Sequence, residues 1–314
     1  MAVTLEAIAT AENFDETGYL AANPDVAEAV RKGQFKSGRQ HFEGYGRRES
    51  RLVRFPRSIA DIQQKKLKRL EPLLRLDLPH VRRGVKYDFL TDALRAETGI
   101  VDTDAISAHG YDPYALDLIS TCRDGLVLDC GAGRRPVYFD HVVNFEIADY
   151  DTTDVLGVGE VLPFQNDSFD GVLSLSVLEH VRDPFACAAE IARVLKPGGK
   201  LICCVPFLQP LHGYPHHYYN MTGQGLRALF ERRLTIDQHI VPRSTLPVFS
   251  LTWFVQSWAR VLRGQSREQF LAMRMSDLLK QPEELQDERW VTELSEAANF
   301  ELASATMLFA HKEA

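Results

Sequence analysis

The stretch "VLDCGAGRRPVYFDHVVNFE", residues 127–146, decides the fold. An apolar run ends at Asp129, and a Gly-Ala-Gly turn at residues 131–133 follows it directly. A strand that enters such a turn is typical of nucleotide-binding sites, because glycine lets the backbone approach a ligand closely. Twelve residues lie between Gly133 and Glu146, which ends the next apolar run. A full crossover helix needs around ten residues plus turns, so we expect a single helical turn or an irregular loop here.

Strands and helices alternate on both sides of this stretch. The strand-like runs are "GLVLDC" (125–130), "VVNFEI" (142–147), "GVLSLSV" (171–177) and "LICCVPF" (201–207). A helical run at 183–195 ends at "KPGGK". This order predicts an α/β fold, a Rossmann-like doubly wound sheet of about seven strands, with a helical N-terminal module. Residues 233–241 and 301–312 are expected to form the last two strands.

The composition restricts the function classes. The 314 residues are 45% hydrophobic and 25% charged, as in an ordinary soluble globular protein. A formal net charge of -7 argues against nucleic acid as the main partner. The five cysteines lack metal-ligand spacing and fit a reducing compartment. The N-terminus has no signal-peptide pattern and no run reaches the length of a membrane span, so we expect a cytoplasmic protein.

Three regions are expected along the chain. Residues 1–55 read as a small helical module, residues 56–108 as a helical connector, and residues 109–314 as the main domain with a helical cap insertion at 244–298. The basic side of the connector helix at 61–74 is interpreted as a solvated face. The apolar segment 246–264 is interpreted as a cap helix packed on the sheet, with peripheral membrane contact as the alternative.

Beyond Glu146, a series of motifs appears in a fixed order. Together with the glycine turn, the set comprises Asp129, Gly131, Gly133, Glu146, "LPF" at 162–164, "SFD" at 168–170, "LEHV" at 178–181, "DP" at 183–184 and "RVLKPGG" at 193–199. This set closely resembles the class I S-adenosylmethionine-dependent methyltransferases, specifically the type 11 branch. The ordered set is specific, whereas any one motif alone would not be.

The resemblance implies S-adenosylmethionine as the cofactor. The glycine turn would lie against the methionine part of the cofactor. Asp129 would bind the ammonium group of that part directly or through water, and Glu146 would bind the ribose hydroxyls. Residues 158–160 would border the adenine, although Val158 stands where the family usually has an acid, which makes Glu160 a candidate for that contact. The implied cofactor-binding residues are Asp129, Gly131, Ala132, Gly133, Glu146, Val158, Gly159, Glu160, Ser174 and Ser176.

The segment after the run at 201–207 would face the methyl acceptor. It is rich in histidine and tyrosine, and histidine is the natural general base near neutral pH. The candidate catalytic residues are His212, His216 and His217, and the candidate substrate-binding residues are Tyr214, Tyr218 and Tyr219. A rigid lid with satisfied histidines is the alternative. No metal is expected, because adjacent histidines rarely face one ion and no carboxylate shows metal-site spacing; His180 is interpreted as structural.

The N-terminal module resembles a repeat unit seen beside bacterial glycan enzymes. The matching residues are Asn23, Pro24, Asp25, Val26, His41, Phe42, Gly46, Glu49 and Arg51. With the polar aromatic loop, this favours O-methylation of a sugar or glycan-precursor hydroxyl. The alternatives are a methyltransferase with a quinone, lipid or amine acceptor, and a non-catalytic scaffold of the same fold.

Overall fold

A seven-stranded sheet forms the centre of the computed structural model, which describes residues 1–55, 59–101, 107–213, 216–304 and 307. The strand order is β11-β10-β6-β8-β9-β5-β4. Neighbouring strands run parallel except for the antiparallel pair β4 and β5. The bounds are β4 Val81–Arg83, β5 Lys86–Asp88, β6 Val127–Cys130, β8 Val142–Glu146, β9 Val155–Leu156, β10 Phe169–Leu175 and β11 Leu195–Cys204. The predicted α/β fold is confirmed.

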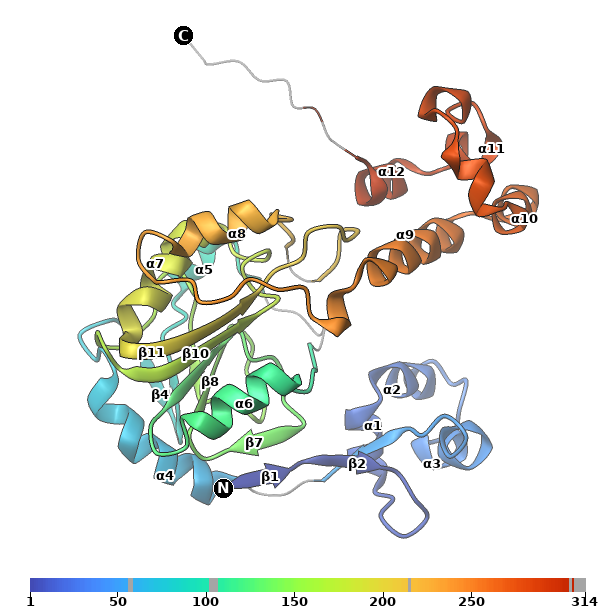
Figure 1. Cartoon of the computed structure of the whole chain (residues 1–314). Helices are drawn as coiled ribbons and strands as arrows, with labels where there is room; N and C mark the ends of the chain where they lie inside the picture. Colours follow the sequence, from blue (N-terminus) through green and yellow to red (C-terminus); the bar gives the residue numbers. More distant parts are fainter. Residues whose placement is uncertain (56–58, 102–106, 214–215, 305–306, 308–314) are drawn as a thin grey trace.

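Helices cover both faces of the sheet (Figure 1). One core cluster joins the sheet to α4 (Ala60–Leu70), α7 (Pro184–Val194) and α8 (Gly223–Phe230), and a smaller one lies under α6 (Pro113–Thr121). The side chain of Asp183 accepts amide hydrogen bonds at the start of α7, and Pro184 occupies the first turn, a favourable combination because those amides have no partner within the helix. The helix that follows β10 is therefore fixed at its start.

Two of the seven strands come from the connector. In addition to α4, the connector holds a 3₁₀ turn (Glu71–Leu73), β4, β5 and α5 (Asp92–Thr98). β5 pairs with β9 and buries Tyr87, with Phe89 just beyond the strand, in the main core. The strand expected at 233–241 does not form, and the one expected at 301–312 falls largely outside the described residues. Residues 301–302 end the helix α12 (Glu296–Leu302).

The shortened crossover after the glycine turn is a strand rather than a helical turn or an irregular loop. β7 (Val137–Phe139) pairs antiparallel with β1 (Ala2–Thr4) at the N-terminus. The amide of Leu5 also donates to the carbonyl of Pro136 at 2.7 Å. The N-terminal segment therefore pairs with the strand that the short crossover forms.

A buried charged side chain lies beneath this crossover. Lys66 of α4 is 1% exposed, and its ammonium lies 2.7 Å from the carboxylate of Asp154 and 3.7 Å from the ring centre of Tyr138. The Tyr138 hydroxyl donates to the other oxygen of Asp154. The interpretation of the basic side of this helix as a solvated face is wrong for Lys66. Because the crossover is too short to form a helix, the Lys66 side chain is buried there beside Asp154.

The N-terminal module has a core of its own, formed by Ala9, Tyr19, Val26, Phe42 and Val53. Its elements are β2 (Glu6–Ile8), α1 (Glu16–Ala22), α2 (Pro24–Arg31), α3 (Gly38–His41), a π-helical turn (Phe42–Gly46) and β3 (Leu52–Arg54). Arg54 fixes the module to the main domain, because its guanidinium lies 2.7 Å from Asp151 of that domain. The same guanidinium lies 2.6 Å from Glu6 within the module.

The cap region also builds a separate core, from Ala259, Leu262, Phe270 and Trp290. It comprises α9 (Pro247–Val261), α10 (Gly264–Ala272), α11 (Arg289–Thr292), α12 and three 3₁₀ turns (Arg243–Thr245, Met275–Leu279 and Pro282–Glu284). Figure 1 shows these helices projecting away from the sheet, so the expected cap helix packed on the sheet is not observed. Within the described ranges, no helix has the length and apolar character needed to cross a membrane.

We predict that Lys66→Met lowers the free energy of unfolding by about 3–5 kcal/mol, because Asp154 would stay buried without its cation. Lys65→Met is the matched control: the neighbouring side chain is exposed, and its loss should change stability by less than about 0.5 kcal/mol. Urea unfolding followed by circular dichroism measures both. Equal stability of the two variants would contradict a structural role for the buried pair.

Candidate functional site

The glycine turn lies at the carboxyl end of β6, the edge at which open parallel sheets bind ligands. Gly131 and Gly133 have φ angles of 79° and 62°, a conformation that favours glycine. A Cβ atom on Gly131 would lie 2.4 Å from the Val177 side chain, and one on Gly133 would lie 2.7 Å from the carbonyl oxygen of Ser107. Glycine is therefore required at both positions. Ala132 between them is buried, and its amide donates to the carbonyl of Phe145.

Glu146 at the end of β8 lies next to this turn. One carboxylate oxygen accepts from the amide of Gly133 at 2.7 Å, and the other accepts from the amide of Ile147 at 2.7 Å. Burial raises the pKa of Glu146, while the amide hydrogen bonds oppose that rise. The acid thus lies beside the glycine turn, as the resemblance implies for a residue that holds the ribose.

Asp129 is fully buried and already paired. Its carboxylate forms a two-point contact with the guanidinium of Arg135 at 2.8 and 3.0 Å, and it accepts from the Tyr111 hydroxyl at 2.6 Å. Burial and the nearby charge of Asp129 raise the pKa of Tyr111 well above its usual value. Asp129 therefore holds Arg135 of the crossover beside the glycine turn. Because its carboxylate is already bound to Arg135 and Tyr111, it would act on the cofactor's ammonium through these two side chains.

The residues expected beside the adenine lie after β9. Val158 is buried, and a Cβ atom on Gly159 would lie 3.0 Å from the sulfur of Cys187. Glu160 accepts from the amide of Arg182 at 3.0 Å, just before α7. This contact gives Glu160 a structural role, and its contact with adenine stays a prediction.

The two serines of the implied site lie at the end of β10. Ser174 is fully buried, whereas Ser176 is exposed and has a φ of 55°. A non-glycine residue in this conformation costs about 1–3 kcal/mol, and such strain clusters at ligand sites. Its amide donates to the carbonyl of Cys204 in β11 at 2.9 Å, which ties the ends of the two strands together.

A cluster of histidines lies beyond the ends of β10 and β11. The ring centres of His212 and His217 are 4.3 Å apart, and those of His180 and His212 are 5.4 Å apart. Burial lowers the pKa of both His180 and His212. His216 instead hydrogen-bonds the carbonyl of Gly99 at 2.8 Å. The structure thus brings two of the three predicted histidines together, and His180 joins them.

Glu179 is a site residue that sequence reasoning missed. Its side chain is fully buried, neither carboxylate oxygen has a described hydrogen-bond partner, and the nearer oxygen lies 3.7 Å from Nε2 of His180. Burial raises the pKa of Glu179 to about 8. The sequence feature that could have identified Glu179 as a site residue is the acid-histidine pair of the "LEHV" motif, which follows shortly after a predicted strand.

The tyrosines of the loop are placed in different ways. The amides of Tyr218 and Tyr219 donate to the carbonyl of Glu179 at 2.7 and 3.2 Å, and both side chains are exposed. The Tyr219 hydroxyl donates to the carbonyl of Arg182. Tyr214 lies outside the described residues. The backbone of this loop therefore fixes Glu179, while two tyrosine rings remain open to solvent.

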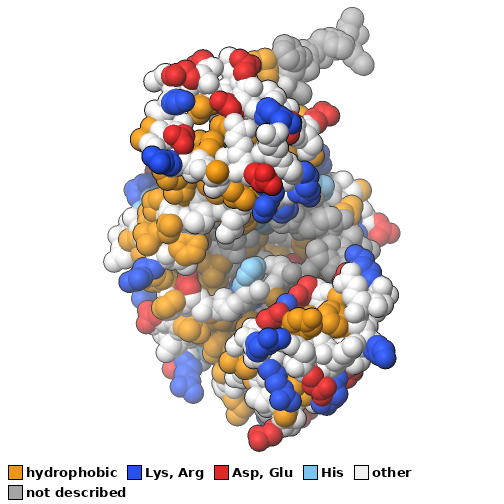
Figure 2. Space-filling model, turned by 90° about the vertical axis from the view of Figure 1, so that its right-hand side faces the viewer, with side chains coloured by type: hydrophobic (Ala, Val, Ile, Leu, Met, Phe, Trp, Pro, Cys, Tyr) orange, Lys and Arg blue, Asp and Glu red, His pale blue; other side chains and the backbone are white. Residues whose placement is uncertain are grey.

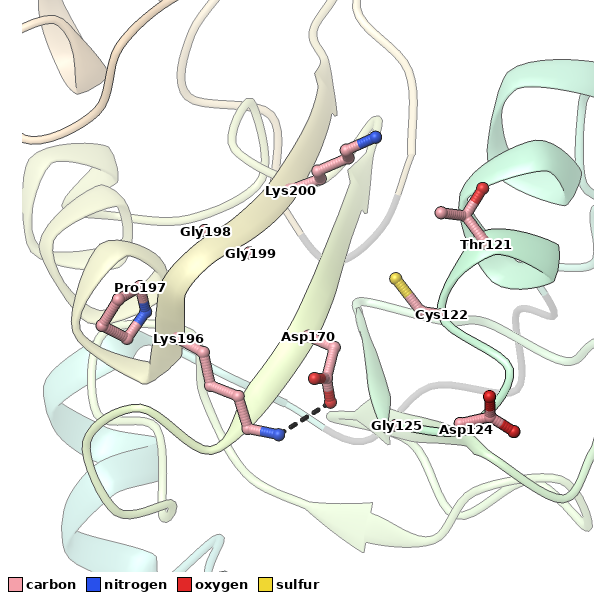
Figure 3. Close-up of a pocket in the computed structure, with 10 residues that line it drawn as sticks. All are labelled: Thr121, Cys122, Asp124, Gly125, Asp170, Lys196, Pro197, Gly198, Gly199 and Lys200. Atoms are coloured by element: carbon pink, nitrogen blue, oxygen red, sulfur yellow. Dashed lines mark hydrogen bonds and ion pairs between the residues drawn. The ribbon is translucent and has the colours of Figure 1, made fainter.

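A cavity of about 320 Å³ lies at the opposite edge of the sheet (Figure 3). It is lined by residues before β6 and at the starts of β10 and β11, including Gly125, Asp170 and Lys196. Lys196 and Asp170 form an ion pair at 2.8 Å across it. Because it lies at the amino ends of the strands, this cavity is separate from the glycine turn.

Comparison with known proteins agrees with this geometry. Residues 130–203 match the family described as "Methyltransferase domain". The central part of the chain is thus similar to the class I, S-adenosylmethionine-dependent methyltransferases whose motifs it carries.

Similar proteins include two quinone-pathway enzymes. The chain is 32% identical over 129 residues to a demethylmenaquinone methyltransferase of Renibacterium salmoninarum, covering 40% of this chain and 48% of that one. It is 29% identical over 138 residues to a ubiquinone biosynthesis O-methyltransferase of Dinoroseobacter shibae, covering 40% and 52%. The chain thus spans about half the length of the curated relatives it matches.

Among solved structures, a methyltransferase of Thermotoga maritima, described as a possible histamine N-methyltransferase, shares 22% identity with this chain. The match covers 30% of this chain and 51% of that one, with a TM-score of 0.22. The likeness of the N-terminal module to units found beside glycan enzymes finds no support in these comparisons.

We predict that Gly131→Ala weakens S-adenosylmethionine binding by about tenfold or more, since a new methyl group must displace Val177 or the turn itself. Gly198→Ala is the matched control, because Gly198 has a φ of 77° but no atom within 4 Å of the place that a methyl group would occupy. Both variants share the backbone strain, and only the first crowds the site. Calorimetry measures the affinities; equal affinities would contradict the assignment of the turn.

Proposed function

We propose that this protein is an S-adenosylmethionine-dependent methyltransferase that methylates a hydroxyl group of a small molecule. The observation that carries the proposal is the position of the glycine turn and Glu146 at the same edge of the sheet as the histidine cluster. When bound, S-adenosylmethionine supplies an electrophilic methyl group on its sulfonium. The protein must then bind it, align an acceptor oxygen and let the hydroxyl proton leave.

The residues at this edge fit the cofactor. The two glycines leave open backbone where a side chain would collide with Val177 or Ser107. Glu146 presents a carboxylate beside the turn, and carboxylates accept hydrogen bonds from ribose hydroxyls. The strained Ser176 ends the strand on the other side of Gly131. These residues would hold the ribose and the methionine part.

The surroundings of the histidine cluster favour an apolar ring as the acceptor rather than a sugar. Phe207, Leu208 and Leu211 follow β11 and are each about half exposed, as is Phe249 of α9. Trp253 of α9 contacts the ring of His212, with ring centres 5.2 Å apart. Figure 2 shows a hollow across this side of the molecule, with a histidine in it and hydrophobic side chains along one edge.

The names of the two relatives support a quinone-type acceptor, and one of the two is named as an O-methyltransferase. A quinol-type ring carries hydroxyl groups and an apolar body, so its body would contact the exposed hydrophobic side chains while a hydroxyl reaches the histidines. The expected sugar acceptor receives no such support from the relatives. We therefore propose a ring hydroxyl on an apolar acceptor.

Purified protein incubated with labelled S-adenosylmethionine tests the acceptor class. The panel contains a catechol with an alkyl tail, the same catechol without the tail, a nucleotide sugar and a primary amine. We expect methyl transfer to the tailed catechol, with a lower KM than for the untailed one. Transfer only to the nucleotide sugar or the amine would overturn the acceptor assignment, and no binding of S-adenosylmethionine at millimolar concentration would favour a scaffold.

We predict that Glu146→Ala weakens S-adenosylmethionine binding by about 1.5–3 kcal/mol, the typical contribution of hydrogen bonds to a charged group. Glu283→Ala is the control, because it removes an exposed carboxylate of the cap region, outside the implied cofactor site. Its effect on affinity should be small. Calorimetry on both variants checks this, and an unchanged affinity for Glu146→Ala would show that the ribose assignment is wrong.

A further inference from the structure

We propose that Glu179, His180 and His212 bind a divalent transition-metal ion beside the acceptor. Each of these residues offers one ligand atom, and the three atoms all lie within 4.8 Å of one another. One carboxylate and two imidazoles form a donor set that suits Zn²⁺ or Fe²⁺ and leaves coordination positions open. No metal was expected from the sequence, because adjacent histidines rarely face one ion and no carboxylate shows metal-site spacing. The fold instead brings together Glu179 and His212, which are far apart along the chain.

The tautomers of the two histidines fit this role. Nδ1 of His180 lies 2.7 Å from the carbonyl of His216, and Nδ1 of His212 lies 3.0 Å from the carbonyl of Pro210. A carbonyl oxygen only accepts, so both Nδ1 atoms carry the proton and both Nε2 atoms keep a lone pair. Metal-binding histidines typically donate their second ring N–H to such a carbonyl, which fixes the ring and its tautomer.

Glu179 supplies an independent argument for a ligand. Its side chain has no exposed surface, and both carboxylate oxygens lack a hydrogen-bond partner in the described part of the chain. A buried carboxyl group without a hydrogen-bond partner is costly in either protonation state, and buried polar groups in proteins are normally hydrogen-bonded, paired or bound to a metal. Its nearer oxygen lies 3.7 Å from Nε2 of His180. A cation between them would satisfy both groups.

The backbone holds these three ligands in place. The amide of His180 donates to the carbonyl of Val177, and the carbonyl of Glu179 accepts from the amides of Tyr218 and Tyr219. His216 anchors the same loop to Gly99. Glu179 and His180 follow β10, and His212 follows β11, so the ligands lie beyond the same strand ends as the implied methionine site.

The ion's role in methyl transfer rests on the proposed function. An acceptor hydroxyl bound to a divalent cation has a lowered pKa, so its proton leaves to solvent. The oxygen then forms the new bond to the methyl carbon, and the electron pair of the broken sulfur–carbon bond stays on sulfur. The site's ability to bind a metal stands without this step.

The full-length protein, stripped with a chelator and dialysed, tests the site. Calorimetric titration with Zn²⁺ should give one ion per chain, and Co²⁺ should give visible absorption bands typical of imidazole coordination. Glu179→Gln and His212→Asn should each weaken Zn²⁺ binding at least tenfold. His239→Asn is the control, since its side chain is exposed and does not belong to the cluster, and this variant should bind Zn²⁺ as the unaltered protein does.

Circular dichroism establishes that each variant is folded. If Glu179→Gln does not fold, His212→Asn decides, because His212 lies on a partly exposed loop. Absence of Zn²⁺ binding by the unaltered protein, or undiminished binding by the folded variants, would overturn the metal site. Methyl transfer at full rate in the stripped protein would refute the ion's role in catalysis and leave the proposed function intact. Zn²⁺ binding without methyl transfer to any acceptor would overturn the proposed function alone.

Discussion

The ion pair between Lys66 and Asp154 is the interaction on which the arrangement of the cofactor edge depends. Between β6 and β8 the chain has no room for a helix, so the space beside the sheet is filled by α4 of the connector and by Tyr138. Asp154 also accepts from the amide of Asn144 in β8 at 2.9 Å. Because Glu146 lies two residues further along the same strand, the buried pair helps to set the position of Glu146, the acid proposed to bind the ribose. The buried charge of Asp154 is tolerated because Lys66, Tyr138 and the amide of Asn144 all bind its carboxylate.

The same constraint gives the N-terminal module a structural reason to be where it is. The three-residue strand β7 needs a neighbour for its backbone hydrogen bonds, and β1 of the N-terminal segment supplies it. Arg54 of the module then binds Asp151, and Arg135 on the crossover binds Asp129 at the glycine turn. The module, the crossover and the turn are thus linked by a continuous series of contacts. This arrangement favours a docking role for the module over an independent binding site.

The features that could be predicted from the sequence are those that depend on the local conformation of the backbone. Gly131, Gly133 and Glu146 could be assigned because a turn with positive φ angles and an acid at a strand end are local features. The strands β4 and β5 could not, since "VRR" and "KYD" contain no apolar run. They form strands only because β5 pairs with β9 and β4 pairs with β5. Lys66 could not either: a lysine in a basic helix has the pattern of a solvated face, and only the missing crossover helix creates its buried site.

Two fully buried carboxyl groups lie at the carboxyl ends of the central strands, those of Asp129 and Glu179, and they differ in their partners. Asp129 has its cation within the chain, because Arg135 follows it by six residues and contacts both oxygens. Glu179 is buried to the same degree, yet the ligand atoms described beside it belong to two imidazoles. The proposed metal ion would give Glu179 the partner that Arg135 gives Asp129.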